Sequence, residues 1–293
     1  MDQCDAVLPA GGLDDSGTEG AAWLGDAHLT GGCRRRSYYR RVSSGELHLD
    51  RARAESFGAV AVQYERYRPR YPAALLDDLA SLRPARVLDV GCGTGKVAVG
   101  LAERGLSVLG VELDPRMAEV ARGHGIPVEV GAFETWDDAG RQFDLITCGA
   151  AWHWIDPELG MAKAAGVLRA GGTIARIWNY HLLDESVLAV FEGLYREHAP
   201  DAHPHGREPD DSDYLDPFTE NEAFCTIEGR TYRWERTLSA EEWVGQAETF
   251  SDHQCLAPER FSAVARALHE TIDTLGGTVH AHGRTYVVLA RRA

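Results

Sequence analysis

Short apolar runs alternate with segments of helical apolar spacing between residues 73 and 178. The runs predict strands at 86–90, 107–112, 128–130, 143–149 and 172–178. The spacing around them predicts helices at 73–81, 96–104, 115–123, 135–140 and 156–168. Asp114 and Pro115 mark one helix start, because Asp accepts hydrogen bonds from the first turn and Pro fits its backbone. Such alternation predicts an α/β fold with a doubly wound, mostly parallel sheet.

The pattern changes on both sides of this region. Residues 1–45 are rich in Gly, Asp, Ser and Thr without a sustained period, so we expect a flexible N-terminal extension. A helix or helix pair is expected over 47–67. Later helices are expected at 184–198, 239–249 and 258–274, and later strands at 224–234 and 284–291. One domain over 46–293 therefore follows the extension.

The net charge and the cysteine spacing disfavour several classes of binding partner and site. The formal net charge of −15 disfavours nucleic acid and anionic membrane surfaces, because both require basic contacts. The six cysteines lack the spacing of a zinc site or a disulfide framework, and free thiols in a reducing cytoplasm explain them most simply.

No apolar run is long enough for a membrane span, and the start of the chain lacks a secretory pattern. We therefore expect a cytoplasmic protein without a metal.

The stretch V-L-D-V-G-C-G-T-G-K at 87–96 carries the most specific signal. It joins a buried strand to a helix through a glycine turn, where backbone N–H groups can approach a ligand closely. Its third glycine is Gly95 and position 96 is Lys96, so the spacing is neither the dinucleotide G-x-G-x-x-G nor a P-loop. Glu112 ends the next strand, about 20 residues beyond the turn, where a carboxylate can accept hydrogen bonds from a ribose diol.

This D-x-G-x-G-x-G stretch resembles motif I of the class I S-adenosylmethionine-dependent methyltransferases. Two further segments resemble the small-molecule branch that includes trans-aconitate and ubiquinone-pathway methyltransferases: Y-x-x-x-R-P-x-Y-P at 64–72 and His-Trp-Ile-Asp at 153–156. The resemblance implies S-adenosylmethionine as cofactor and a seven-stranded, Rossmann-like methyltransferase domain over 46–293. Its sheet would end in an antiparallel hairpin, with a substrate-side cap inserted at about 180–225.

The resemblance also implies which residues surround the donor. Asp89 is expected near its ammonium group, with bracing of the loop as the alternative role. Ala132 stands where the family often has an Asp for adenine, so we expect adenine to meet Phe133 and Glu134; core packing is the alternative for Phe133. The full set of expected donor contacts is Tyr64, Tyr67, Arg68, Asp89, Gly91, Cys92, Gly93, Gly95, Glu112, Leu113, Ala132, Phe133, Glu134, Cys148 and Gly149.

The acceptor side is less specific in the sequence. His153 is the candidate general base, since it titrates near neutral pH, and holding its loop is the alternative role. Small and aromatic residues near the ends of the fourth and fifth strands are expected to line the acceptor pocket. These are Ala151, Trp152, Trp154, Trp178 and Tyr180. The resemblance implies a small-molecule acceptor, in secondary metabolism or cofactor biosynthesis, and these residues do not separate O- from C-methylation.

Two other functions remain open at this stage. A macromolecule methyltransferase is disfavoured by the acidity and by the lack of an N-P-P-Y motif after the fourth strand. A non-catalytic S-adenosylmethionine-binding module is disfavoured by the intact glycine turn and Glu112. His198, His203 and His205 match no strong metal-ligand spacing and are interpreted as a polar loop that can line a pocket. The extension or the cap could mediate contact between copies of the chain.

Overall fold

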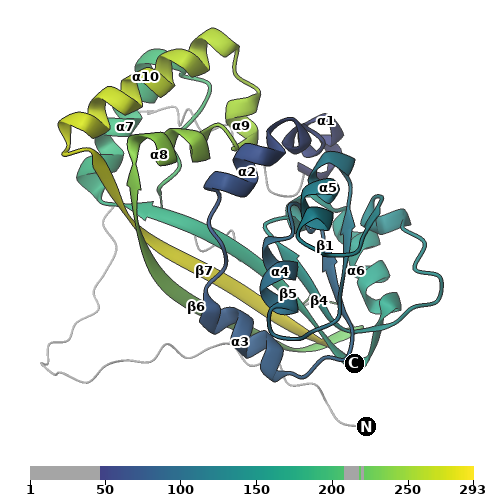
Figure 1. Ribbon diagram of the computed structural model, residues 1–293. Coiled ribbons are helices and arrows are strands. Elements are labelled where there is room, and N and C mark those ends of the chain that lie inside the picture. The colour runs from purple at the N-terminus through teal and green to yellow at the C-terminus, as the bar shows by residue number, and fades with distance from the viewer. Residues whose placement is uncertain (1–46, 208–217, 219–220) are drawn as a thin grey trace, which may run out of the picture.

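The computed structural model describes residues 47–207, 218 and 221–293 (Figure 1). The predicted extension at 1–45 therefore lies outside the described residues. The strands are β1 (Val87–Val90), β2 (Val108–Glu112), β3 (Val128–Val130), β4 (Phe143–Gly149), β5 (Leu168–Leu183), β6 (Phe224–Ser239) and β7 (Thr278–Arg292). The helices are α1 (Arg51–Ala54), α2 (Ala61–Tyr67), α3 (Ala73–Ser81), α4 (Lys96–Ala102), α5 (Pro115–Gly123), α6 (Pro157–Val167), α7 (Glu185–His198), α8 (Ala240–Ala247), α9 (Ser251–Gln254) and α10 (Pro258–Thr274).

The strands form one sheet in the order β3-β2-β1-β4-β5-β7-β6. β1 to β5 pair in parallel, and β7 runs antiparallel to both β5 and β6. The predicted α/β fold with a doubly wound, mostly parallel sheet is confirmed. All four residues of β1 are buried, as expected for a central parallel strand that is covered on both faces.

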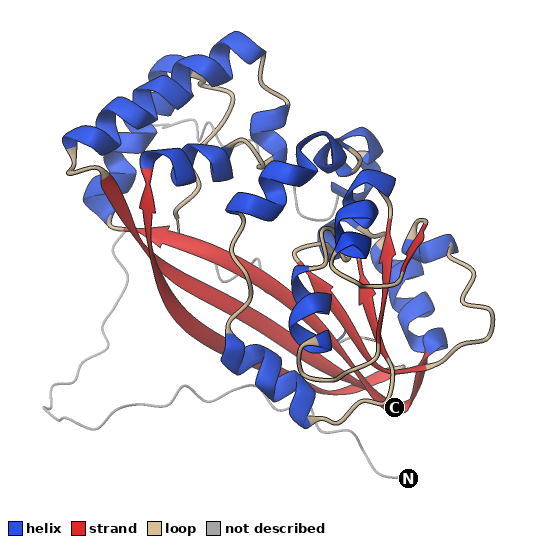
Figure 2. Cartoon of the chain, viewed as in Figure 1, coloured by secondary structure: helices blue, strands red, loops and turns tan. Residues whose placement is uncertain are grey.

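Successive residues of β1 face two different cores. Val87 packs in a cluster with apolar residues of α3, α4 and α5, such as Leu101. Leu88 packs in a second cluster that includes Val167 of α6. Side chains alternate across a strand, so these helices cover opposite faces of the sheet (Figure 2).

β5, β6 and β7 extend beyond the parallel part of the sheet and carry a helical cap at their far end (Figure 1). Phe191 of α7, Trp243 of α8 and Leu268 of α10 pack there with Leu183 and other buried residues of the strand ends. The sequence predicted a cap from about 180–225, but α8, α9 and α10 come from residues after 239. β5 also continues to Leu183 rather than ending at residue 178, because residues 173–183 pair with 281–291 of β7.

Among the described residues, no helix combines the length and the apolar character that crossing a membrane would require.

Candidate functional site

The glycine turn between β1 and α4 requires backbone conformations that other residues rarely adopt. Gly91, Gly93 and Gly95 have φ angles of +60°, +56° and +88°. A Cβ atom on Gly91 would lie 2.5 Å from the Cβ atom of Ala151, closer than such atoms can approach. The turn therefore needs glycine both for its own backbone and for its fit against the end of β4.

Two adjoining cavities lie at the carboxyl ends of the parallel strands, on either side of this turn. We call them the Asp89 cavity and the Glu112 cavity after a buried acid in each. The walls common to both are Tyr64, Gly91, Gly93, Gly149 and Ala150. Ala150 has a φ angle of +53°, an uncommon conformation of the kind that gathers at functional sites. A single elongated ligand can thus contact both acids across the glycine turn.

Glu112 is held rigidly at the end of β2. Its carboxylate accepts hydrogen bonds from the backbone N–H groups of Gly93 (2.7 Å) and Asp114 (2.9 Å). Burial raises the pKa of this carboxyl group. A carboxylate has about four lone-pair sites, so these two bonds leave acceptor capacity for a ligand with hydroxyl groups.

Asp89 lines its cavity, and only one of its two carboxylate oxygens has a hydrogen-bond partner among the described residues. The Thr147 hydroxyl donates to Oδ1 over 2.7 Å, while Oδ2 is buried without a hydrogen-bond partner among the described residues. The side chain is about 1% exposed, and burial raises its pKa to about 7. A buried acceptor without a partner is costly, so the site is suited to a ligand that brings a cationic donor.

Residues 87–172, which include the glycine turn and both acids, match the family model described as a methyltransferase domain. The described fold also resembles a solved structure of a candidate type II methyltransferase from Anaeromyxobacter dehalogenans. That likeness has a TM-score of 0.56 and 23% identity, and it covers 77% of this chain and 97% of the other. The chain carries a methyltransferase domain over residues 87–172.

Curated relatives resemble less than half of the chain. An uncharacterized methyltransferase of Mycobacterium tuberculosis is 39% identical over 127 residues, which are 42% of this chain and 52% of the relative. A ubiquinone biosynthesis O-methyltransferase of Bordetella avium is 31% identical over 155 residues, covering 45% of this chain and 63% of the relative. The chain thus spans about half to two thirds of the length of these relatives.

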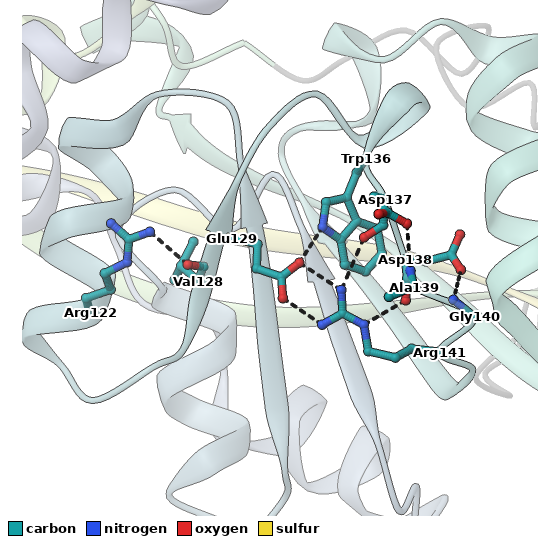
Figure 3. A network of polar contacts seen from close by, with 9 residues as sticks. All are labelled: Arg122, Val128, Glu129, Trp136, Asp137, Asp138, Ala139, Gly140 and Arg141. Atoms are coloured by element: carbon teal, nitrogen blue, oxygen red, sulfur yellow. Dashed lines mark hydrogen bonds and ion pairs between the residues drawn. The ribbon is translucent and has the colours of Figure 1, made fainter.

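The loop after β3 forms one wall of the Glu112 cavity in the methyltransferase domain, through Ala132, Phe133 and Glu134. Figure 3 shows how residues just beyond this wall are fixed: Glu129 accepts hydrogen bonds from Trp136 Nε1 (2.7 Å) and from both terminal nitrogens of Arg141 (2.6 and 2.8 Å). This bidentate pair holds both ends of the loop together. The wall is thereby placed without help from a ligand.

The helix predicted over 135–140 is wrong. The Asp137 and Asp138 side chains accept hydrogen bonds from the N–H groups of Ala139 and Gly140 (Figure 3). Such local bonds offer the backbone an alternative to a helix, and both Ala139 and Gly140 have positive φ angles.

The segment at 64–72 connects the methyltransferase domain to the cap. Arg68 donates to Thr249 through Nε (2.7 Å to Oγ1) and Nη2 (3.0 Å to the carbonyl), and its guanidinium lies 4.1 Å from the ring centre of Phe250. Tyr64 and Arg68 line the Asp89 cavity, as the resemblance implied for a donor site. Tyr67 does not, because its hydroxyl donates to Glu241 and its ring packs against α8.

The other predicted site residues divide between the two cavities. Cys92 lines the Asp89 cavity and Leu113 the Glu112 cavity, while Gly95 and Cys148 line neither. Of the expected acceptor residues, Ala151 and Trp154 line the Glu112 cavity and Tyr180 lines the Asp89 cavity.

Three residues expected on the acceptor side lie elsewhere. Trp152 fills the core, where its ring centre is 5.3 Å from that of Phe218. Trp178 packs against Tyr286 of β7 and lines neither cavity. His153 also lines neither cavity; burial lowers its pKa to about 4, with a smaller contribution from the positive charge of Arg53. The structure therefore gives no support to His153 as the general base.

His181 and Phe250 are among the residues of the Asp89 cavity that were not predicted from the sequence. His181 continues β5 past the predicted strand end, and its Nε2 atom is buried without a partner among the described residues. Burial lowers the pKa of His181 to about 3, so its ring is neutral at pH 7. The polar–apolar alternation of 178–183 could have indicated His181. Phe250 immediately precedes α9 and lines the cavity, and nothing in the sequence pattern connects it with the glycine turn.

Proposed function

We propose that the protein transfers a methyl group from S-adenosylmethionine to a small-molecule acceptor, by O- or C-methylation. The observation that carries this proposal is the pair of adjoining cavities, with Glu112 and the unsatisfied Asp89 on opposite sides of one glycine turn. The Bordetella avium relative, named as an O-methyltransferase of ubiquinone biosynthesis, supports a small-molecule oxygen acceptor.

The residues present fit each part of this donor. Glu112 has acceptor capacity for the ribose hydroxyls, and the fixed loop with Phe133 offers an apolar wall to adenine. Asp89 Oδ2 lacks the cationic partner that the donor ammonium would supply. Arg68, already oriented by Thr249, supplies a positive charge for the donor carboxylate.

When bound, S-adenosylmethionine supplies a methyl group on a positively charged sulfur. The chain must then orient an acceptor in line with that methyl group and exclude water, which can supply about 7–11 kcal/mol in favourable cases. Gly149 and Ala150, where the two cavities meet, keep the space between donor and acceptor free of large side chains. His181 offers one unpartnered ring nitrogen to orient a polar acceptor.

Binding and turnover test the proposal separately. Isothermal titration calorimetry with S-adenosylmethionine and S-adenosylhomocysteine should give one saturable site per chain. Incubation with a panel of phenols, carboxylic acids and enolisable small molecules should release S-adenosylhomocysteine with at least one of them. A protein that binds neither donor nor product would contradict the proposal, whereas binding without turnover on a broad panel would favour a non-catalytic module.

Tyr64 and Tyr67 provide a matched pair within one segment. We expect Tyr64→Ala to weaken S-adenosylhomocysteine binding about tenfold, because Tyr64 forms part of both cavity walls. Tyr67→Ala should bind within about twofold of the unmodified protein, since this side chain faces Glu241. Calorimetry on both variants, with circular dichroism as a check of folding, would expose an error if Tyr67→Ala were the weaker binder.

A further inference from the structure

Three side chains that can ligate a metal converge at the cap side of the Asp89 cavity. His205 lies in the connection after α7, while Asp252 and His253 lie on α9. One ligand atom from each of the three lies within 4.8 Å of the others. Of the three, His205 lines the cavity, so the cluster adjoins its wall.

His253 has one ring nitrogen that is held and one that is free in the described part of the chain, and its Nδ1 lies 3.9 Å from Asp252 Oδ1. Its Nδ1–H donates to the carbonyl oxygen of Ala247 over 2.9 Å, which fixes both the ring and its tautomer. Nε2 is therefore left with a lone pair, in a residue that is about 2% exposed, and it has no partner among the described residues. A backbone carbonyl that holds the non-ligating nitrogen is the usual support of a metal-bound imidazole.

The ligand atoms of His205 and Asp252 are about as far apart as two neighbouring ligand atoms in a zinc site. His205 Nε2 lies 3.2 Å from Asp252 Oδ1. Ligand distances of about 2.0–2.1 Å in a tetrahedral zinc site place neighbouring ligand atoms about 3.3 Å apart. The ring of His205 stacks on Phe250, with 3.5 Å between ring centres, and this contact limits its rotation.

We propose that His205, Asp252 and His253 bind a zinc-like divalent cation at the edge of the Asp89 cavity. Two imidazoles and one carboxylate favour Zn²⁺ and its first-row neighbours over Mg²⁺ or Ca²⁺, which prefer oxygen ligands. Three protein ligands leave a coordination position open, as in catalytic zinc sites. An oxygen-bearing small molecule in the cavity can occupy that position; this last point alone rests on the proposed function.

A second cluster in the described residues serves as an internal comparison. Glu235, His280 and His282 lie together on β6 and β7, but all three are exposed. Their carboxylate and imidazoles face solvent, where a cation would gain little from leaving water. We make no proposal for this cluster, and its removal is the control for metal binding at the surface.

The test uses the full-length protein after dialysis against a chelator. Calorimetric titration with Zn²⁺ and visible absorption with Co²⁺ should show one tight site per chain. Asp252→Asn and His205→Ala should each weaken Zn²⁺ binding by more than about 100-fold, because even loss of a group that only supports a ligand costs about 10–100-fold. His280→Ala should leave this site unchanged. Thermal unfolding of each apo variant checks that it is folded.

Either of two results would overturn the proposal: no saturable Zn²⁺ binding by the unmodified protein, or binding that survives in His205→Ala and Asp252→Asn but is lost in His280→Ala. S-adenosylhomocysteine binding, measured on the same apo protein, reports separately on the methyl-donor site. Metal binding without donor binding would support the metal site and contradict only the proposed function.

Discussion

Glu112→Ala is expected to reduce affinity for S-adenosylhomocysteine by at least about 100-fold. The variant removes the hydrogen bonds proposed to the ribose hydroxyls, each worth about 1.5–3 kcal/mol when the acceptor is charged. It also removes the acceptor for the Gly93 and Asp114 N–H groups, so the glycine turn loses one of its hydrogen bonds to β2. Calorimetric titration of the variant with S-adenosylhomocysteine measures the combined effect.

Two companion variants separate these contributions. Glu112→Gln keeps the shape but only one acceptor oxygen, so we expect an intermediate loss of affinity. Glu119→Ala removes an exposed acid on α5 and should leave affinity unchanged. Near-normal binding by Glu112→Ala would place the ribose elsewhere and would remove the main support for this donor site.

The parallel part of the sheet could be predicted from the sequence because its strands are buried on both faces. Such strands appear as continuous apolar runs, and β3 and β4 have the predicted bounds. The glycine turn was also predictable, since its three positive φ angles depend on local backbone geometry alone. Local rules were thus sufficient for the part of the site formed by β1, β2 and the turn.

The cap depends on contacts between distant segments, so the sequence pattern predicted its main helices but not how they assemble on the strand ends. Asn179 and His181 are polar and resemble the start of a loop, yet they belong to β5 because β7 supplies their partners. Tyr64 and Tyr67 are equally plausible aromatic contacts in the sequence. Only the packing of α2 against α8 shows that Tyr67 faces away from the cavities.

The dependence on contacts between distant segments also explains why some of the predicted acceptor residues lie away from the cavities. Trp152 looked like a pocket residue because it follows small residues at the end of β4. In the structure, Phe218 and the helix α6 enclose it, and a tryptophan contributes more by core burial than by exposure at a cavity. His205 reaches the cavity although its sequence context is that of a polar loop.

Asp89→Asn is expected to stabilise the protein above pH 7 while weakening the donor site. Burial raises the Asp89 pKa from 3.8 to about 7 in the native state, so the folded protein binds this proton more tightly than the unfolded chain does. Stability from this group is therefore fully present below about pH 4 and is lost as the pH rises to about 7. The loss is at most about 4 kcal/mol, at 1.36 kcal/mol for each pKa unit.

Asparagine cannot ionise, and its carbonyl oxygen can still accept the Thr147 hydrogen bond. Chemical unfolding at pH 5 and pH 8 should therefore show a greater advantage of Asp89→Asn at pH 8. In the same variant, affinity for S-adenosylhomocysteine at pH 8 should fall about 30-fold, since an ion pair with the ligand ammonium is lost, at about 2 kcal/mol. Affinity of the unmodified protein should rise with pH up to about 7, relative to the variant.

Thr147→Val provides the matched control for this acid. It removes the hydroxyl that stabilises the Asp89 carboxylate but leaves the acid in place, so it should raise the Asp89 pKa further and lower stability at pH 8. Opposite changes in stability from two neighbouring, buried substitutions would be difficult to explain by packing alone. If Asp89→Asn were instead less stable at pH 8 and bound the ligand normally, Asp89 would act only to brace the loop. A gain in stability with a loss of binding would show that the cost of the buried carboxylate is retained for the ligand.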